Sequence, residues 1–203
     1  MLLTLRVRDL LLASWDADPE QIARALPPGL APAPVDGRHL VTIAALRYTS
    51  GRLGRAPIVP FSQLNVRAYV EHEGEPAVVF LLARVTLPGM AAALLGAPYR
   101  PARLRVDRGR AEAPGLGVSI AYEPRGQHDP SPLAAHVLGL YEAAGLRAFR
   151  IRRGPAVWQR ADPLGSTRAD PLIALGFDAS TPPSLLYAET AAFEAEVPPR
   201  RVR

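Results

Sequence analysis

Short stretches of alternating apolar and polar residues, separated by proline and glycine, constrain the fold of this chain most strongly. In the clearest stretch, residues 64–73, the even-numbered positions from 64 to 70 are aliphatic and Asn65, Arg67 and Tyr69 lie between them. A period of two is typical of a β-strand, so these three side chains are predicted to share one face. Similar patterns and their flanking turns predict further strands at residues 3–15, 39–48, 77–85, 103–106, 117–122, 146–152, 156–160 and 185–197. We expect the segments 146–152 and 156–160 to pair with each other.

Helices are predicted to be few and short. Residues 18–20 (Asp-Pro-Glu) form a helix start, and Pro27 ends that helix, because aspartate caps a first turn and proline cannot continue a helix. Gly96 is expected to end a helix in the left-handed conformation, and residues 51–60 are predicted to form a loop. Further helices are predicted at residues 88–95, 131–140 and 170–175. The pattern predicts an α+β, mainly β fold, and no linker interrupts residues 1–203, so we predict a single domain.

The composition excludes several classes of chemistry. The chain has no cysteine, so disulfides, thiolate nucleophiles and cysteine-bound metals are excluded. Its four histidines lack the spacing typical of a zinc site, and we predict no metal and no cofactor. No apolar run approaches the roughly 18 residues that cross a bilayer, so we predict no membrane partner and a cytoplasmic location.

The basic charge comes entirely from arginine, because the chain contains no lysine. A net charge of +5 is compatible with nucleic-acid binding. However, the arginines are scattered among 19 acidic residues, and in the densest segment, residues 101–110, Arg103 and Arg105 alternate with apolar residues. This alternation is typical of the solvated face of a strand, so we predict no nucleic-acid partner.

Four short motifs, taken in order, are similar to those of one known superfamily. They are Leu26-Pro27-Pro28-Gly29-Leu30, the strand Leu64 to Tyr69, the turn Gly96-Ala97-Pro98-Tyr99-Arg100, and the tail Val197-Pro198-Pro199-Arg200-Arg201. In order and spacing they resemble the acetoacetate decarboxylase-like superfamily, and most closely its uncharacterised YqjF-like branch. The resemblance covers nearly the whole chain and implies a β-cone or barrel with a few short helices and an internal pocket. It also implies a homo-oligomer.

The chain departs from that superfamily where the decarboxylases carry their reactive lysines. In those enzymes the turn reads Gly-x-Pro-Lys-Lys, and the first lysine forms an imine with the substrate while the second lowers its pKa. Here the two positions hold Tyr99 and Arg100. A phenol cannot form an imine, and a guanidinium remains protonated and is a poor nucleophile. Decarboxylation through a Schiff base is therefore excluded.

The polar face of the strand at residues 64–73 has two interpretations. Asn65, Arg67 and Tyr69 are either the solvent-exposed face of an edge strand or, as the resemblance implies, part of the pocket wall. In a pocket, Arg67 would hold an anion, because a guanidinium binds a carboxylate through two hydrogen bonds. Asn65 would donate and accept hydrogen bonds, and Tyr69 would offer an apolar ring with a polar tip.

Tyr99 and Arg100 also have two interpretations. Tyr99 is either a half-buried packing residue or the pocket hydroxyl and candidate catalytic acid, and Arg100 either pairs on the surface or supports an anion. We therefore predict a protein that binds a small molecule, an organic acid or another carbonyl or carboxylate compound, or a lysine-independent enzyme, with Asn65, Arg67, Tyr69, Tyr99 and Arg100 at the site. The alternative is a non-catalytic oligomeric module whose pocket is filled by its own side chains. The sequence leaves open whether the chain catalyses a reaction.

Overall fold

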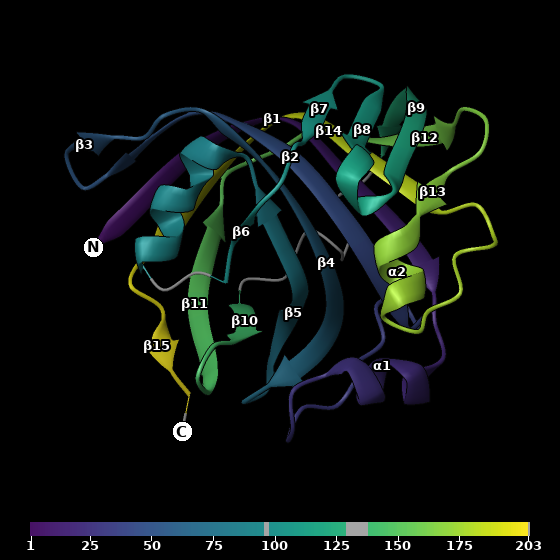
Figure 1. Cartoon of the computed structure of the whole chain (residues 1–203), viewed down its shortest axis with the longest axis horizontal. Coiled ribbons are helices and arrows are strands. Elements are labelled where there is room, and N and C mark those ends of the chain that lie inside the picture. Colours follow the sequence, from purple (N-terminus) through teal and green to yellow (C-terminus); the bar gives the residue numbers. More distant parts are fainter. Residues whose placement is uncertain (96–97, 129–137, 203) are drawn as a thin grey trace.

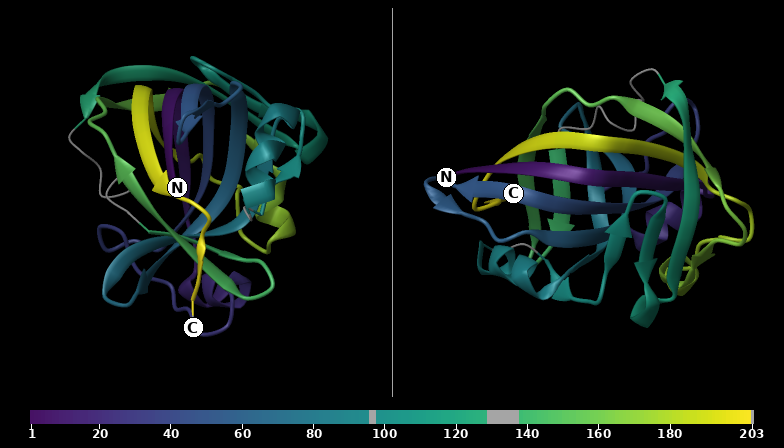
Figure 2. Two further views of the ribbon diagram at one scale, coloured as in Figure 1. Left: turned by 90° about the vertical axis from the view of Figure 1, so that its left-hand side faces the viewer. Right: turned by 90° about the horizontal axis from the view of Figure 1, so that it is seen from above.

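A closed β-barrel forms the centre of the computed structural model, which describes residues 1–95, 98–128 and 138–202 (Figure 1). Its strands follow one another around the barrel, and β11 pairs with β14 to close it. They are β1 (Leu2–Asp16), β2 (Leu40–Leu53), β4 (Phe61–His72), β5 (Glu75–Val85), β10 (Leu138–Glu142), β11 (Leu146–Arg153) and β14 (Ser184–Glu196). The left-hand view of Figure 2 shows these strands arranged around a common interior. The predicted mainly β barrel is confirmed.

The sheet continues beyond the barrel, and short elements cover its outer face. From β14 it extends through β12 (Trp158–Pro163), β9 (Val118–His128), β8 (Arg110–Ala113) and β7 (Arg105–Asp107). Shorter strands are β3 (Ala56–Pro57), β6 (Arg100–Pro101), β13 (Arg168–Ala169) and β15 (Arg200–Arg201). The helices are α1 (Pro19–Ala25) and α2 (Asp170–Ala174), and the 3₁₀ helices are η1 (Leu87–Leu95) and η2 (Pro114–Leu116). None of the helices in the described part of the chain is long and apolar enough to cross a bilayer.

The central strands bury both faces. On β4, Leu64, Val66 and Ala68 belong to an outer core layer that also contains Ile22 of α1 and Leu172 of α2. The opposite face of the barrel sheet turns inward, where a second core layer surrounds the barrel interior. Because side chains alternate along a strand, each central strand contributes to both layers.

The start of α1 agrees with its predicted capping. The carboxylate Oδ1 of Asp18 accepts a hydrogen bond of 2.7 Å from the backbone N–H of Glu20, and Pro19 occupies the first turn. The helix predicted at residues 88–95 is present as the 3₁₀ helix η1, and α2 begins at Asp170 as predicted. Gly96, predicted to end η1, lies outside the described residues.

Three local predictions are wrong. The segments 146–152 and 156–160 do not pair with each other, because β11 pairs with β10, β14 and β15 while β12 pairs with β9 and β14. Of the helix predicted at residues 131–140, the described part, from 138, belongs to strand β10, and the remainder lies outside the described residues. The loop predicted at 51–60 contains the end of β2 and strand β3, which form a hairpin.

A bulge in β1 changes which residues of that strand face inward. Between Arg8 and Leu11 the pairing with β2 shifts register, and Asp9 adopts a positive φ of 54°. Before the bulge the odd-numbered Leu3 and Leu5 face the interior, and after it the even-numbered Leu10 and Leu12 do. The extra residue in one strand of the pair causes this change of parity.

Candidate ligand-binding site

The barrel interior contains a partly open cavity of about 130 Å³. Every strand of the barrel contributes to its wall, for example Ala44 from β2, Phe80 from β5, Tyr141 from β10 and Phe193 from β14. Most of the wall is aliphatic or aromatic. A concave, largely apolar cavity with a few polar groups is the usual form of a small-molecule site.

Strand β4 supplies a row of polar side chains to this wall. Gln63, Asn65 and Arg67 all line the cavity, and at most 6% of each residue is exposed. The interpretation of this face as the solvent side of an edge strand is therefore wrong, because β4 lies between β2 and β5. Nε and Nη2 of Arg67 and Oδ1 of Asn65 are buried without a hydrogen-bond partner. Buried polar atoms are usually paired, so these atoms are suited to a ligand.

A second arginine, Arg153 of β11, reaches the same cavity. Its guanidinium lies 5.7 Å from the ring centre of Phe193. Burial and, next, the positive charge of Arg67 lower the pKa of Arg153 to about 10. Arg153 is therefore still charged at neutral pH. Since no aspartate or glutamate is found among the described residues of the cavity wall, this part of the cavity is positive.

Two tyrosine hydroxyls meet one amide oxygen at the cavity wall. Tyr99 and Tyr48 donate to Oε1 of Gln63, with oxygen–oxygen distances of 3.1 and 3.0 Å. Burial is the main cause that raises the pKa of Tyr99, whereas its bond to Gln63 acts in the opposite direction. The phenol therefore stays protonated at neutral pH and can donate a hydrogen bond, but it cannot serve as a base.

The structure brings three of the five predicted site residues to the cavity. Asn65, Arg67 and Tyr99 line it. Tyr69 is buried beside it, where its hydroxyl donates to Oγ1 of Thr42 at 2.9 Å and its ring lies 5.6 Å from the Arg67 guanidinium. It therefore supports Arg67. Arg100 is exposed on β6, next to Arg84 of β5, and is not among the described residues of the wall.

Sequence reasoning missed three polar residues of the wall. Gln63 stands two residues before Asn65, so extending the same alternation by one step would have found it. Arg153 and Tyr48 come from strands that reach the cavity only through closure of the barrel, and no local pattern indicates this. Trp158, which we would assign from its sequence to a core or an interface, is buried and also lines the cavity.

The wall is suited to holding and polarising an anion. It offers two guanidinium groups, amide groups and a phenol. Among the described residues of the chain, no three histidine, aspartate or glutamate side chains gather in a group that could hold a metal ion. The described wall also lacks histidine and carboxylate side chains that could act as a base.

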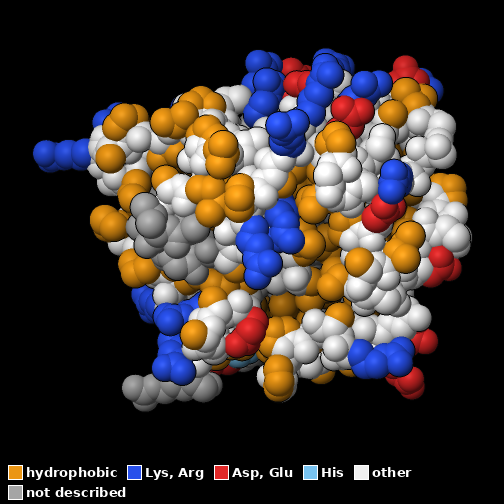
Figure 3. Space-filling model, viewed as in Figure 1, with side chains coloured by type: hydrophobic (Ala, Val, Ile, Leu, Met, Phe, Trp, Pro, Cys, Tyr) orange, Lys and Arg blue, Asp and Glu red, His pale blue; other side chains and the backbone are white. Residues whose placement is uncertain are grey.

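The densest arginine segment lies away from the cavity, on an exposed face. Arg105 pairs with Asp107, Arg108 with Glu189, and Arg110 with Glu112. In Figure 3, basic side chains along the upper edge stand beside acidic ones. Exposed pairs of this kind are typical of a solvated surface.

Comparisons with known proteins agree with this architecture. The model of the family DUF2071, described as "uncharacterized conserved protein", matches residues 4–192. No curated protein matches the sequence. An acetoacetate decarboxylase-like enzyme from Sphingomonas wittichii RW1 is 12% identical, with a TM-score of 0.71 over 100% of this chain and 94% of that one. Acetoacetate decarboxylase from Legionella pneumophila is 12% identical, with a TM-score of 0.69, and the match covers 99% of this chain and 87% of that one. The enduracididine biosynthesis enzyme MppR, solved with pyruvate, is 16% identical, with a TM-score of 0.64, and the match covers 97% of this chain and 90% of that one.

Proposed function

Since this chain belongs to the DUF2071 family of uncharacterized conserved proteins, its function has to be inferred from the site, and we propose that the barrel cavity binds a small organic carboxylate. The site supports binding more directly than it supports any particular reaction.

The observation that carries the proposal is the environment of Arg67. Its side chain is buried at a cavity wall, and its Nε and Nη2 have no hydrogen-bond partner. A buried charge without compensation is strongly unfavourable, and a carboxylate would satisfy both nitrogens through a bidentate pair. Arg153 would add a second positive charge, and Asn65 and Tyr99 would add hydrogen bonds.

Two further points support a ligand over a self-filled interior. The cavity of about 130 Å³ leaves room beside the unpartnered groups of Arg67 and Asn65. MppR, a protein of similar fold, has been solved with pyruvate, which is itself a small carboxylate. We therefore favour a binding site over an oligomeric module without a ligand.

Imine chemistry is not part of the proposal, because the chain has no lysine. Treatment with pyruvate and sodium borohydride is expected to leave every residue after Met1 unmodified, since reduction traps only imines of primary amines. Peptide mass spectrometry would measure this. A reduced adduct at any other position would contradict the exclusion.

Binding is expected to depend on pH through Arg153. A carboxylate ligand with a pKa near that of glutamate is ionised above about pH 6. Its affinity should be constant from there to about pH 9. Above pH 10 the affinity should fall, by up to about tenfold per pH unit, because the pKa of Arg153 is lowered to about 10 and the neutral side chain attracts an anion less. Calorimetric titration with hexanoate and with hexanamide, its neutral analogue, would measure both charge and pH dependence.

Unfolding of the chain caused by deprotonation of Arg153 would not explain this fall in affinity above pH 10. The pKa of Arg153 is lower in the folded chain than in the unfolded chain, so above pH 10 the unfolded chain binds more protons at this residue. Its contribution to the free energy of unfolding therefore rises with pH.

An Arg153→Met variant should bind hexanoate with an affinity that does not change with pH above about pH 6. Equal binding of acid and amide would contradict the proposal.

A further inference from the structure

The cavity has two chemically different parts. Polar groups come mainly from β4 and from Tyr99 and Arg153. Another part of the wall, formed by Leu10, Leu12, Ala44, Leu46 and Trp158, is apolar, and each of these residues is at most 5% exposed.

The strand register places these two parts side by side. Leu46 of β2 lies opposite Gln63, and Ala44 lies opposite Asn65. On the other side of β2, β1 brings Leu10 and Leu12 into the wall beyond its bulge. Neighbouring strands are about 4.8 Å apart, so the aliphatic surface begins one strand away from the polar row. A ligand held at Arg67 therefore contacts apolar side chains with the rest of its body.

The size of the cavity limits that body. A closed apolar cavity of about 150 Å³ is known to hold one benzene molecule. The present cavity, at about 130 Å³, is of similar size. It has room for one small ring or a short chain.

From these observations we propose that the ligand is an amphipathic monocarboxylate whose apolar body has about five to seven carbon atoms, such as an aryl or short-chain alkyl acid. This inference rests on the proposed function and adds a ligand class to it. A short hydrophilic keto acid would leave the leucine surface and Trp158 without a contact.

A series of straight-chain acids from acetate to decanoate tests this ligand class. The dissociation constant is expected to fall about threefold to fourfold for each added methylene group as far as hexanoate, because each group leaves water for an apolar surface. Beyond that length it should level off or rise, because the cavity is full. Calorimetry with the matched amides as neutral controls would give both trends.

A variant that narrows the cavity should shift the preferred length. A methyl group added at Gly139 would overlap the ring of Phe149, which lines the cavity. Gly139→Ala is therefore expected to push this ring inward and move the optimum to a shorter acid. Gly126→Ala is the matched control, because an added methyl group there meets nothing within 4 Å.

A second variant covers the case in which Gly139→Ala does not fold. Leu46→Ala removes side-chain volume from the apolar wall, so the optimum should move to a longer acid. If acids of every length bind equally in the unmodified chain, the amphipathic class is wrong and carboxylate binding still holds. If no acid binds more tightly than its amide, the proposed function itself is wrong.

Discussion

An Arg67→Met chain is expected to bind hexanoate about 100-fold more weakly than the unmodified chain, yet to unfold at the same or a higher temperature. Removing one partner of a buried charge pair costs about 2–5 kcal/mol of binding free energy. In the ligand-free chain, however, the Arg67 guanidinium is buried with unpartnered nitrogens. Replacing a buried charge by an apolar side chain of similar size is often neutral or stabilising by about 1–4 kcal/mol.

Weaker binding together with unchanged or higher stability would identify Arg67 as a ligand-binding residue and not a structural one. Calorimetry would measure binding, and thermal unfolding without ligand would measure stability. Arg100→Met is the control, because Arg100 occupies the neighbouring predicted position but is exposed outside the described cavity wall. It should change neither quantity appreciably. A large loss of stability in Arg67→Met with unchanged affinity would show that Arg67 is structural.

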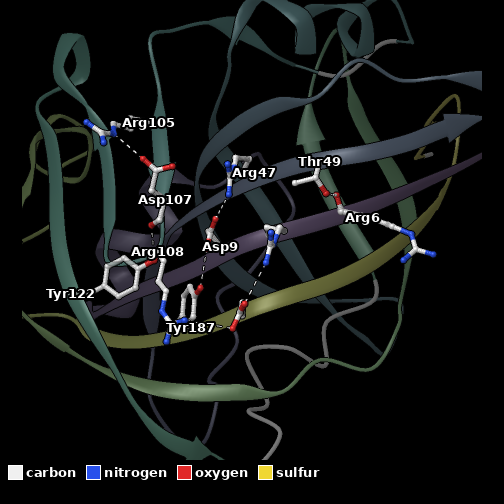
Figure 4. Close-up of polar contacts among 11 residues, drawn as sticks. Arg6, Asp9, Arg47, Thr49, Arg105, Asp107, Arg108, Tyr122 and Tyr187 are labelled. Atoms are coloured by element: carbon white, nitrogen blue, oxygen red, sulfur yellow. Dashed lines mark hydrogen bonds and ion pairs between the residues drawn. The ribbon is translucent and has the colours of Figure 1, made fainter.

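Asp9→Ala is expected to lower the free energy of unfolding by about 3 kcal/mol. Asp9 is buried, and its carboxylate accepts hydrogen bonds from Arg47 at 2.6 Å and from the hydroxyl of Tyr187 at 2.9 Å (Figure 4). Removing it leaves the Tyr187 hydroxyl buried without an acceptor, which costs about 1–3 kcal/mol. Alanine also tolerates the positive φ of this position poorly.

Asp9→Asn separates the two causes of this loss. Asparagine accepts the hydrogen bond from Tyr187 and tolerates a positive φ, so only the ion pair with Arg47 is weakened, and the loss should be about 1 kcal/mol. Asp16→Ala is the control, since Asp16 forms an exposed pair with Arg38, and exposed pairs contribute about 0–1 kcal/mol. Urea denaturation would measure all three variants. Equal losses in Asp9→Ala and Asp16→Ala would contradict a buried role for Asp9.

The sequence predicted the polar row on β4 because a strand has a simple period. Asn65, Arg67 and Tyr69 share the predicted side, and Asn65 and Arg67 reach the cavity wall. What the alternation could not decide was whether that side meets solvent or an interior. That depends on β2 and β5 lying on either side of β4, which is a property of the whole sheet.

Arg153 and the pairing of β11 could not be predicted from local patterns for the same reason. β11 lies next to β12 in the sequence, yet both strands pair with β14 at different positions along it. The alternation of apolar and polar residues in β11 and β12 is equally compatible with pairing between these two strands and with pairing of each to β14. The choice is made by closure of the barrel, which involves contacts far apart in the chain.

The bulge at Asp9 has a consequence for how relatives of this protein should be aligned. A homologue that lacks Asp9 would lose the extra residue, and regular alternation from Val7 would still direct its counterparts of Leu10 and Leu12 into the cavity. Aligning such a homologue without a gap at Asp9 would match inward-facing with outward-facing side chains on one side of the bulge. Correct gap placement in this short segment is therefore needed before the cavity residues of β1 are compared between relatives.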